Sequence, residues 1–188
     1  MDLGQDDILA PAMSSYVGLY RNTLTGVALS LVAGKAAATL EIEGAARPEN
    51  IVTFNGELNG EAVFQPLDGG RMFYFRRGKS LRVANANGTI EDYVRVERAK
   101  PTAQELGELV GTYSSDEAET VLDVVLSGDT LAVKRRPDTT LALRPIYKDA
   151  FSAQGLGLVR FRRDAAGAVT ALSVTLDRVW DLRFERRR

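Results

Sequence analysis

Residues 16–20 read Tyr-Val-Gly-Leu-Tyr, and residues 109–113 read Leu-Val-Gly-Thr-Tyr. The two central glycines lie 93 positions apart (111 − 18), and the turns that follow them, Gly34-Lys35 and Gly128-Asp129, lie 94 positions apart (128 − 34). A nearly constant offset between matching landmarks is the signature of an internal repeat. We therefore interpret the chain as two copies of one unit.

The ends of the two copies also match, with a smaller offset. Residues 75–77 and 161–163 both read Phe-Arg-Arg and lie 86 positions apart (161 − 75). Residues 95–98 (Arg-Val-Glu-Arg) and 183–186 (Arg-Phe-Glu-Arg) lie 88 positions apart (183 − 95). The drop from 94 to 86 predicts about eight extra residues in the first copy. We assign them to the turn-rich stretch 44–60.

Hydrophobic residues alternate with polar ones in both copies, which predicts β-strands. Each copy contains about eight such segments when the Gly-x-Tyr segment is counted. In the second copy the residues that share a face are Leu122, Val124 and Leu126; Leu131 and Val133; Leu141 and Leu143; Phe151; Val159 and Phe161; Leu172, Val174 and Leu176; and Leu182 and Phe184. Pairs such as Asn55-Gly56 and Asn87-Gly88 favour tight hairpin turns, so sequence neighbours are expected to pair antiparallel.

Eight short strands joined by tight turns are expected to form a closed up-and-down barrel, because closure removes the exposed edges of the sheet. The predicted fold is therefore all-β, with two tandem eight-stranded antiparallel barrels. The predicted boundaries are an N-terminal tail at 1–11, a first barrel at 12–99, a linker at 100–107 and a second barrel at 108–188.

One short helix is expected in the linker. Pro101 interrupts the strand pattern, and Thr102 and Glu105 have the spacing of a capping box. This arrangement predicts a helix from about Ala103 to Glu108.

The composition excludes several kinds of chemistry. The chain has no cysteine and no histidine, so zinc, copper, haem and iron–sulfur sites lose their usual ligands, and no triad with a histidine base can form. No cofactor is expected. A net charge of −1 gives no electrostatic reason to expect nucleic-acid binding.

The sequence predicts neither a membrane span nor a secretory leader. No apolar run reaches the roughly 18 residues that a membrane span requires. Asp2, Asp6 and Asp7 distinguish residues 1–15 from a basic leader, so any export signal is expected to be absent or removed. The cellular compartment stays open.

Large aromatic residues are expected to fill the barrel interiors. An eight-stranded barrel is only just wide enough for its own inward side chains, although lipocalins of that strand number hold a small ligand. Because aromatic stripes are more often core, we favour packed interiors over ligand cavities. The residues concerned are Phe54, Phe64, Phe73 and Phe75 in the first copy and Phe151, Phe161, Trp180 and Phe184 in the second.

These landmarks resemble the lipocalin-like β-barrel domains found C-terminal to serine hydrolases of the β-lactamase and penicillin-binding type. The shared features are the Val-Gly-x-Tyr opening, the Gly-Asp or Gly-Lys turn, the Phe-Arg-Arg strand and the Arg-Phe-Glu-Arg ending. The likeness is best over 108–187 and weaker over 12–99. Two tandem barrels also look like the non-catalytic part of the D-aminopeptidases of that superfamily. There, the resemblance implies, the barrels pack beside the catalytic domain and shape access to its site, often outside the bacterial cytoplasm.

The catalytic motif of that family is missing from this chain. Acyl transfer of that type requires Ser-x-x-Lys, and no serine here has a lysine three residues later. Residues 20–22 match a bare Tyr-x-Asn pattern, which we interpret as a strand end that enters a turn. We therefore expect no enzymatic activity; any activity would belong to a separate hydrolase domain.

Three other patterns suggest a binding or catalytic site but are better explained as structural features. The stretch 26–35 has the wrong glycine spacing for a phosphate loop and is expected to form a hairpin. Glu41 and Glu43 resemble paired catalytic carboxylates, but the alternation directs them toward water. Residues 116–119 supply three carboxylates without calcium-loop spacing, so we expect a turn or loop.

Basic clusters occur at the ends of several predicted strands. A nucleic-acid surface would combine such clusters with exposed aromatic side chains, whereas the aromatic residues here are predicted to point inward. We therefore favour basic side chains that are simply exposed to solvent. The clusters are Arg76-Arg77, Lys134-Arg135-Arg136, Arg162-Arg163 and Arg186-Arg187-Arg188.

Two arginines are expected to have a structural role. Arg95 and Arg183 are predicted to stack over Tyr20 and Tyr113, where the first and last strands of each barrel meet. The complete predicted structural signature is Gly18, Tyr20, Arg95, Gly111, Tyr113 and Arg183.

Two functions from different classes follow. In the first, the chain is an accessory module that docks on a serine-hydrolase domain or on itself, which predicts an exposed apolar patch on a barrel wall. In the second, it is a free-standing binder of a small apolar ligand, which predicts a dry cavity of at least a few hundred Å³ with an open mouth.

Overall fold

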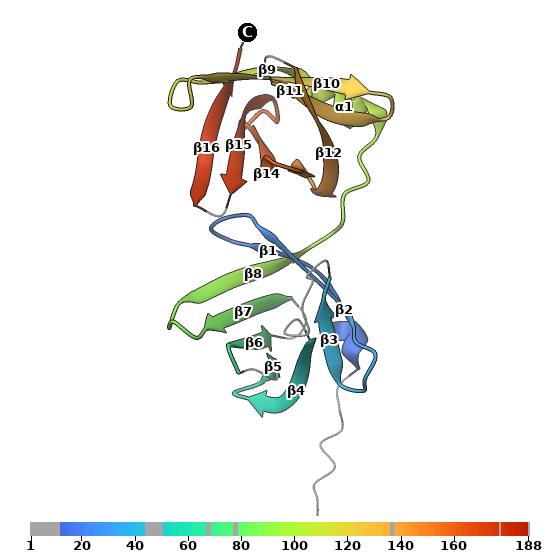
Figure 1. The fold of residues 1–188 in the computed structure, drawn as a ribbon. Helices are drawn as coiled ribbons and strands as arrows, with labels where there is room; N and C mark the ends of the chain where they lie inside the picture. The colour runs from blue at the N-terminus through green and yellow to red at the C-terminus, as the bar shows by residue number, and fades with distance from the viewer. Residues whose placement is uncertain are drawn as a thin grey trace, which may run out of the picture. The chain divides into compact units, whose positions relative to one another are not determined.

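The computed structural model describes residues 12–43, 51–66, 69–76, 79–135, 138–176 and 178–187. The chain forms two closed barrels of eight antiparallel strands each, in which sequence neighbours pair and the last strand returns to the first (Figure 1). The prediction of two tandem up-and-down barrels is confirmed. The predicted tail at 1–11 and part of the predicted insertion, 44–50, lie outside the described residues.

The first barrel follows a short 3₁₀ turn, η1, at Met13–Ser15. Its closure depends on the pairing of β1 with β8, in which Tyr20 lies opposite Arg95. The strands are β1 (Gly18–Asn22), β2 (Ala28–Ala33), β3 (Thr39–Ile42), β4 (Ile51–Leu58), β5 (Glu61–Pro66), β6 (Arg71–Arg76), β7 (Ser80–Asn85) and β8 (Ile90–Val96).

The second barrel repeats this order. It closes where β9 pairs with β16, with Tyr113 opposite Arg186. The strands are β9 (Gly111–Ser115), β10 (Thr120–Ser127), β11 (Thr130–Arg135), β12 (Thr139–Tyr147), β13 (Ala150–Ala153), β14 (Gly157–Arg163), β15 (Val169–Leu176) and β16 (Val179–Arg186).

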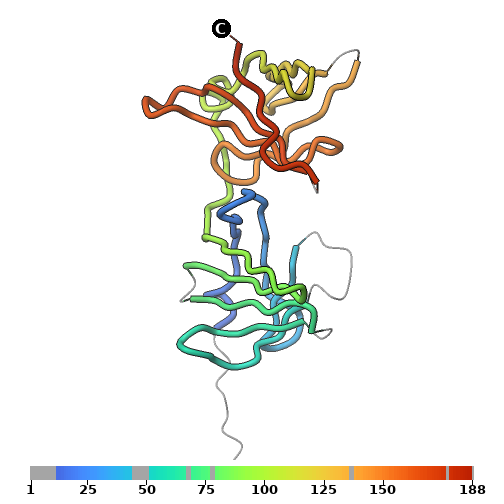
Figure 2. Tube along the Cα trace, turned by 90° about the vertical axis from the view of Figure 1, so that its left-hand side faces the viewer, coloured from blue at the N-terminus to red at the C-terminus, as the bar shows by residue number. Residues whose placement is uncertain are grey.

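One helix, α1 (Ala103–Leu109), precedes β9, and Figure 2 shows the uncoiled segment that leads into it. The predicted capping box is present: Thr102 accepts from the backbone N–H of Glu105, whose side chain accepts in return from the backbone N–H of Thr102. Leu106 and Leu109 are buried in the core of the second barrel. The helix is therefore part of the second barrel's packing.

The chain divides into compact units at Val96, giving residues 1–96 and 97–188. The predicted first barrel ends three residues later, at residue 99, and the prediction gives 100–107 as a linker with a short helix. The segment after Val96 belongs to the second unit because the backbone N–H of Ala99 donates to the carbonyl oxygen of Ile146 at 3.0 Å and α1 buries its apolar side chains in the second barrel. None of the helices in the described residues has the length and apolar composition that crossing a membrane takes.

Candidate functional site

We call the place where the last strand of a barrel pairs with its first strand the seam. In the first barrel, a tyrosine and an arginine stabilise this seam. The ring of Tyr20 is fully buried, and its hydroxyl donates to the backbone oxygen of Tyr16 at 2.8 Å. From β8, Nη2 of Arg95 donates to the carbonyl oxygen of Val17 at 2.6 Å, and Nη1 donates to that of Ser15 at 3.3 Å. These bonds join the last strand to the chain that enters the first strand.

The second barrel has the same seam. The hydroxyl of Tyr113 donates to the carbonyl oxygen of Leu109 at 2.8 Å. Arg186 donates through Nη2 to Val110 at 2.6 Å and through Nη1 to Val169 at 3.2 Å. Its guanidinium carbon lies 6.0 Å from the centroid of the Tyr113 ring, a cation–π distance.

Both seams require a glycine. A Cβ atom at Gly18 would lie 2.9 Å from Nε of Arg95, and one at Gly111 would lie 2.9 Å from Nε of Arg186. Each arginine therefore occupies the space that a side chain on the first strand would need. This close approach explains why the Gly-x-Tyr motif recurs.

The predicted pairing of Arg183 with Tyr113 is wrong, because Arg186 occupies that place. Arg183 lies three residues earlier in β16, and positions three apart on a strand face opposite sides of the sheet. Its side chain is exposed and donates to Asp181 at 3.1 Å. The residue of the first barrel that matches Arg183 is Asp92, which precedes Arg95 by three positions.

Burial keeps the two seam tyrosines protonated. It raises the pKa of Tyr113 to about 12, an effect that the charge of Arg186 opposes. It also raises the pKa of Tyr20, again against the nearby charge of Arg95. Both hydroxyls therefore remain hydrogen-bond donors across the physiological pH range.

The described interior of the first barrel is filled by edge-to-face aromatic pairs. Phe64 contacts Tyr16, Phe54 and Phe75 with ring centroids 5.2, 5.5 and 5.2 Å apart, and Phe75 lies 5.8 Å from Tyr20. Centroid separations in this range are typical of well-packed aromatic cores. The rings occupy the space that a ligand would need.

The second interior is filled in the same way, with one exception to the prediction. Phe161 packs against Tyr113 at 5.8 Å and against Phe151 at 5.7 Å. Trp180, predicted to point inward, is 65% exposed. It follows the β15–β16 turn and precedes Asp181, whose φ of +57° interrupts the strand alternation.

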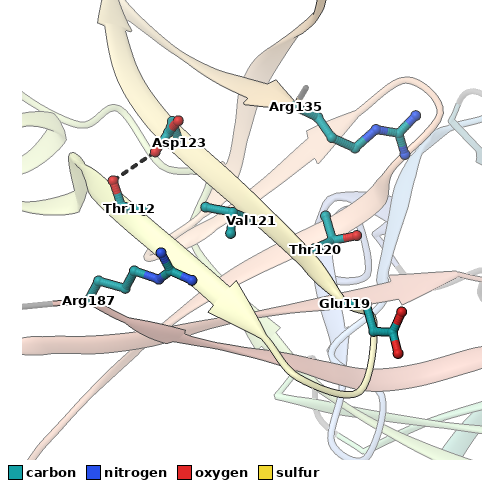
Figure 3. Close-up of a pocket in the computed structure, with 7 residues that line it drawn as sticks. All are labelled: Thr112, Glu119, Thr120, Val121, Asp123, Arg135 and Arg187. Atoms are coloured by element: carbon teal, nitrogen blue, oxygen red, sulfur yellow. Dashed lines mark hydrogen bonds between the residues drawn. The ribbon is translucent and has the colours of Figure 1, made fainter. Parts of the chain in front are cut away.

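A polar hollow of about 770 Å³ lies on β9–β11 of the second barrel (Figure 3). Its lining is Thr112, Glu119, Thr120, Val121, Asp123, Arg135 and Arg187. Thr112 and Asp123 point toward one another and share a 2.7 Å hydrogen bond. Because the lining carries charges of both signs and one apolar side chain, it does not suit an apolar ligand.

A smaller hollow of about 210 Å³ lies beside α1. Leu109 and Phe151 contribute apolar surface, and Lys100, Lys148 and Arg163 contribute charge. Arg163 is already engaged, since its guanidinium donates to both carboxylate oxygens of Asp149 and to Glu108. The network ties β14 to α1 and the β12–β13 turn.

The Tyr-x-Asn segment of β1 has a structural role. The side-chain oxygen of Asn22 accepts from the backbone N–H groups of Leu24 and Thr25, both at 2.9 Å. This is the strand end entering a turn that the sequence predicted. The stretch 26–35 contributes β2, one arm of a hairpin with β1.

The acidic candidates do not assemble into a catalytic or metal site. Glu43 accepts from Ser30 at 2.7 Å, whereas Glu41 accepts from the backbone of Lys35. Residues 116–119 form the β9–β10 turn, as expected. Within the described ranges, no group of three or more acidic side chains is arranged to hold a metal ion.

The paired arginines of β14 bind different acidic residues. Arg163 contacts Asp149, whereas Arg162 bonds to Asp181 on the outer wall. Arg77, Arg136 and Arg188 lie outside the described residues. Sequence reasoning missed the outer-wall group around Asp181, since it depends on contacts between strands.

Comparison with known families and curated proteins gives no assignment: no family profile matches the chain, and the search of curated proteins found no match.

Proposed function

We propose that this chain is a non-catalytic accessory module that docks on a serine hydrolase of the β-lactamase and D-aminopeptidase type and shapes access to its active site. The observation that carries the proposal is an exposed apolar group on the β15–β16 hairpin of the second barrel. Leu176 and Val179 are cross-strand partners there, 42% and 38% exposed, and Trp180, the next residue of β16, is 65% exposed.

This group has the composition of a protein-binding surface. Tryptophan is enriched among residues that dominate binding energy, and a cluster of exposed large apolar side chains marks an interaction site more often than single ones do. We refer to Leu176, Val179 and Trp180 as the hairpin patch. It matches the apolar wall expected of a docking module.

The filled interiors weigh against the alternative function. A binder of a small apolar ligand needs a dry internal space, whereas both described interiors are occupied by contacting aromatic rings. The two described hollows carry charged linings. We therefore favour protein docking over ligand storage.

The experiment starts from the gene. A Ser-x-x-Lys hydrolase domain encoded with or beside this chain is expressed, and its binding to the chain is measured by calorimetry. We expect Trp180→Asp to abolish binding. Ile90→Asp, at a first-barrel position that is 63% exposed, is the matched control and is expected to leave binding unchanged.

Two results would overturn the proposal. One is the failure of such a hydrolase domain to bind the chain at all. The other is saturable one-to-one binding of an apolar fluorescent dye that is lost on Phe161→Trp but not on Trp180→Asp, because that pattern would place a ligand inside the barrel. Loss of self-association in Trp180→Asp, without hydrolase binding, would identify a second copy as the partner instead.

A further inference from the structure

The outer wall of the second barrel carries three arginines gathered around one carboxylate. Arg160 and Arg162 come from β14, and Arg183 comes from β16. Nη2 of Arg183 lies 3.1 Å from Asp181, Nη2 of Arg160 lies 3.8 Å away, and Arg162 donates to the same carboxylate. We call these four residues the arginine cluster.

Strand register explains why the cluster forms. Ser173 of β15 is paired with Arg160 on one side and with Arg183 on the other. Ser173 is 1% exposed, so the two arginines extend outward on either side of a small covered residue. Residues far apart in the chain thus converge on one face of the sheet.

The cluster has more positive charge than its own acid can neutralise. Three guanidiniums face one carboxylate, which leaves a local excess of two positive charges. Glu185 lies further along the same face of β16 but forms no ion pair with any described residue. Asp181 is therefore the one described carboxylate in ion-pair contact with these arginines, and Glu185 is set apart from Arg162 by Ala171.

Hydrogen-bond donors are also in excess. A guanidinium offers five N–H donors, whereas a carboxylate offers about four acceptor positions. The Nε atoms of Arg160 and Arg162 are buried and have no partner in the described protein. The outer ends of the side chains remain reachable, since Arg162 is 37% exposed and Arg183 is 54% exposed.

The first barrel shows that the fold does not require this excess. At the matching positions of its outer wall, Tyr74, Arg82 and Asp92 are cross-strand neighbours. Arg82 lies over the Tyr74 ring at 4.9 Å and donates to Glu61 at 2.7 Å. Arg76 lies 3.8 Å from the same Glu61. In this group the carboxylates of Glu61 and Asp92 therefore balance the guanidiniums of Arg76 and Arg82.

Asp181 is held in place as the internal counterion. Its φ of +57° lies in the left-handed region, which aspartate and asparagine tolerate better than most residues. Burial raises the pKa of Asp181, but hydrogen bonds from Arg162 and Arg183 outweigh that effect and lower it. The carboxylate therefore stays charged at neutral pH. It accepts hydrogen bonds from only some of the N–H donors that the three arginines offer.

We propose that the arginine cluster binds a doubly charged phosphate-type oxyanion. Guanidinium groups bind such anions through paired, charge-assisted hydrogen bonds, and a dianion matches the local excess of charge. Free phosphate and a phosphomonoester on an organic molecule share this chemistry. The proposal does not rest on the docking function proposed above, although Asp181 directly follows Trp180 of the hairpin patch.

The test uses the intact chain labelled with ¹⁵N. Inorganic phosphate, phenyl phosphate and acetate are titrated at matched ionic strength, and the arginine side-chain N–H signals are followed by NMR. We expect saturable shifts with the two phosphates and none with acetate. The tighter of the two phosphates identifies whether the free ion or a phosphomonoester is the preferred form.

Two variants and a matched control assign the site. Arg183→Gln is expected to weaken phosphate binding by at least about tenfold, because it removes charge-assisted hydrogen bonds. Arg82→Gln, at the matching wall of the first barrel, is expected to leave the Kd unchanged. Asp181→Asn keeps a residue that tolerates positive φ and removes the internal anion, so phosphate should bind more tightly.

Failure is equally measurable. The absence of a saturable phosphate response in the wild-type chain overturns the site, as does equal weakening by Arg82→Gln and Arg183→Gln. If Arg183→Gln does not fold, Asp181→Asn decides alone, since unchanged or weaker phosphate binding by that variant contradicts the proposal.

Discussion

Arg186 donates to the backbone oxygen of Val110 across 2.6 Å, and this bond closes the second barrel where its last strand meets its first. The guanidinium also bonds to Val169 and lies over the ring of Tyr113. One side chain thus joins β16, the start of β9 and the start of β15. The stability of the barrel should depend on it.

Replacing Arg186 is therefore expected to destabilise the second barrel. Hydrogen bonds to a charged group contribute about 1.5–3 kcal/mol, so Arg186→Ala should lower the free energy of unfolding by about 2 kcal/mol or more. Arg183→Ala is the control, because exposed ion pairs contribute about 0–1 kcal/mol. Urea titration followed by NMR measures each barrel separately. A larger loss in Arg183→Ala than in Arg186→Ala would refute the assignment of the seam.

The Tyr113 hydroxyl is expected to contribute through its bond to Leu109. Tyr113→Phe removes the donor and leaves a buried carbonyl without its partner, which costs about 1–2 kcal/mol. Tyr20→Phe should have the same effect in the first barrel, because its bond to Tyr16 is equally long. The measurement is again urea titration with resolved signals. An effect on the other barrel would show that the seams are not local.

Alkaline pH should destabilise the fold through the buried tyrosines. The folded-state pKa of Tyr113 and of Tyr93 is raised to about 12, above the ordinary value of 10.0. The folded state then holds these protons more tightly than the unfolded state does, so stability is complete below about pH 10 and is lost as the pH rises toward 12. Thermal unfolding across this range checks the slope, which Tyr113→Phe should reduce. A pH-independent melting temperature between these limits would contradict the expectation.

Two glycines should respond to alanine in opposite directions. Gly107 lies in α1 with no neighbouring atom in reach of a new Cβ, so Gly107→Ala should stabilise the protein by about 0.5–1 kcal/mol. At Gly111 the Cβ would meet Arg186, and overpacking of this kind costs about 1–3 kcal/mol. Calorimetric melting of both variants is the measurement. Stabilisation by Gly111→Ala would mean that Arg186 can move aside without loss.

The barrels were predictable because their signals are local. Alternation by two, asparagine–glycine turns and the capping box at Thr102 each act within a few residues, and they gave the strand order and the helix. The glycine and tyrosine of each seam were also found from their repeat. These features depend on neighbours in sequence, which a single chain displays directly.

The arginines were harder to assign because their partners lie on other strands. Arg183 and Arg186 belong to one short motif, and only the pairing of β16 with β9 shows which of them meets Tyr113. The arginine cluster joins β14 to β16 across β15, a separation that no spacing rule covers. The exposure of Trp180 depends on the left-handed Asp181 beside it, which alternation alone does not predict.

Each half of the molecule contains everything needed to close itself. The arginine and tyrosine that close each barrel belong to that barrel alone, so the outer wall of either barrel can differ without disturbing the closure of the other. The balanced charges around Arg82 and the excess of arginine around Arg183 are such a difference. One strand arrangement therefore presents two chemically different outer surfaces within a single chain.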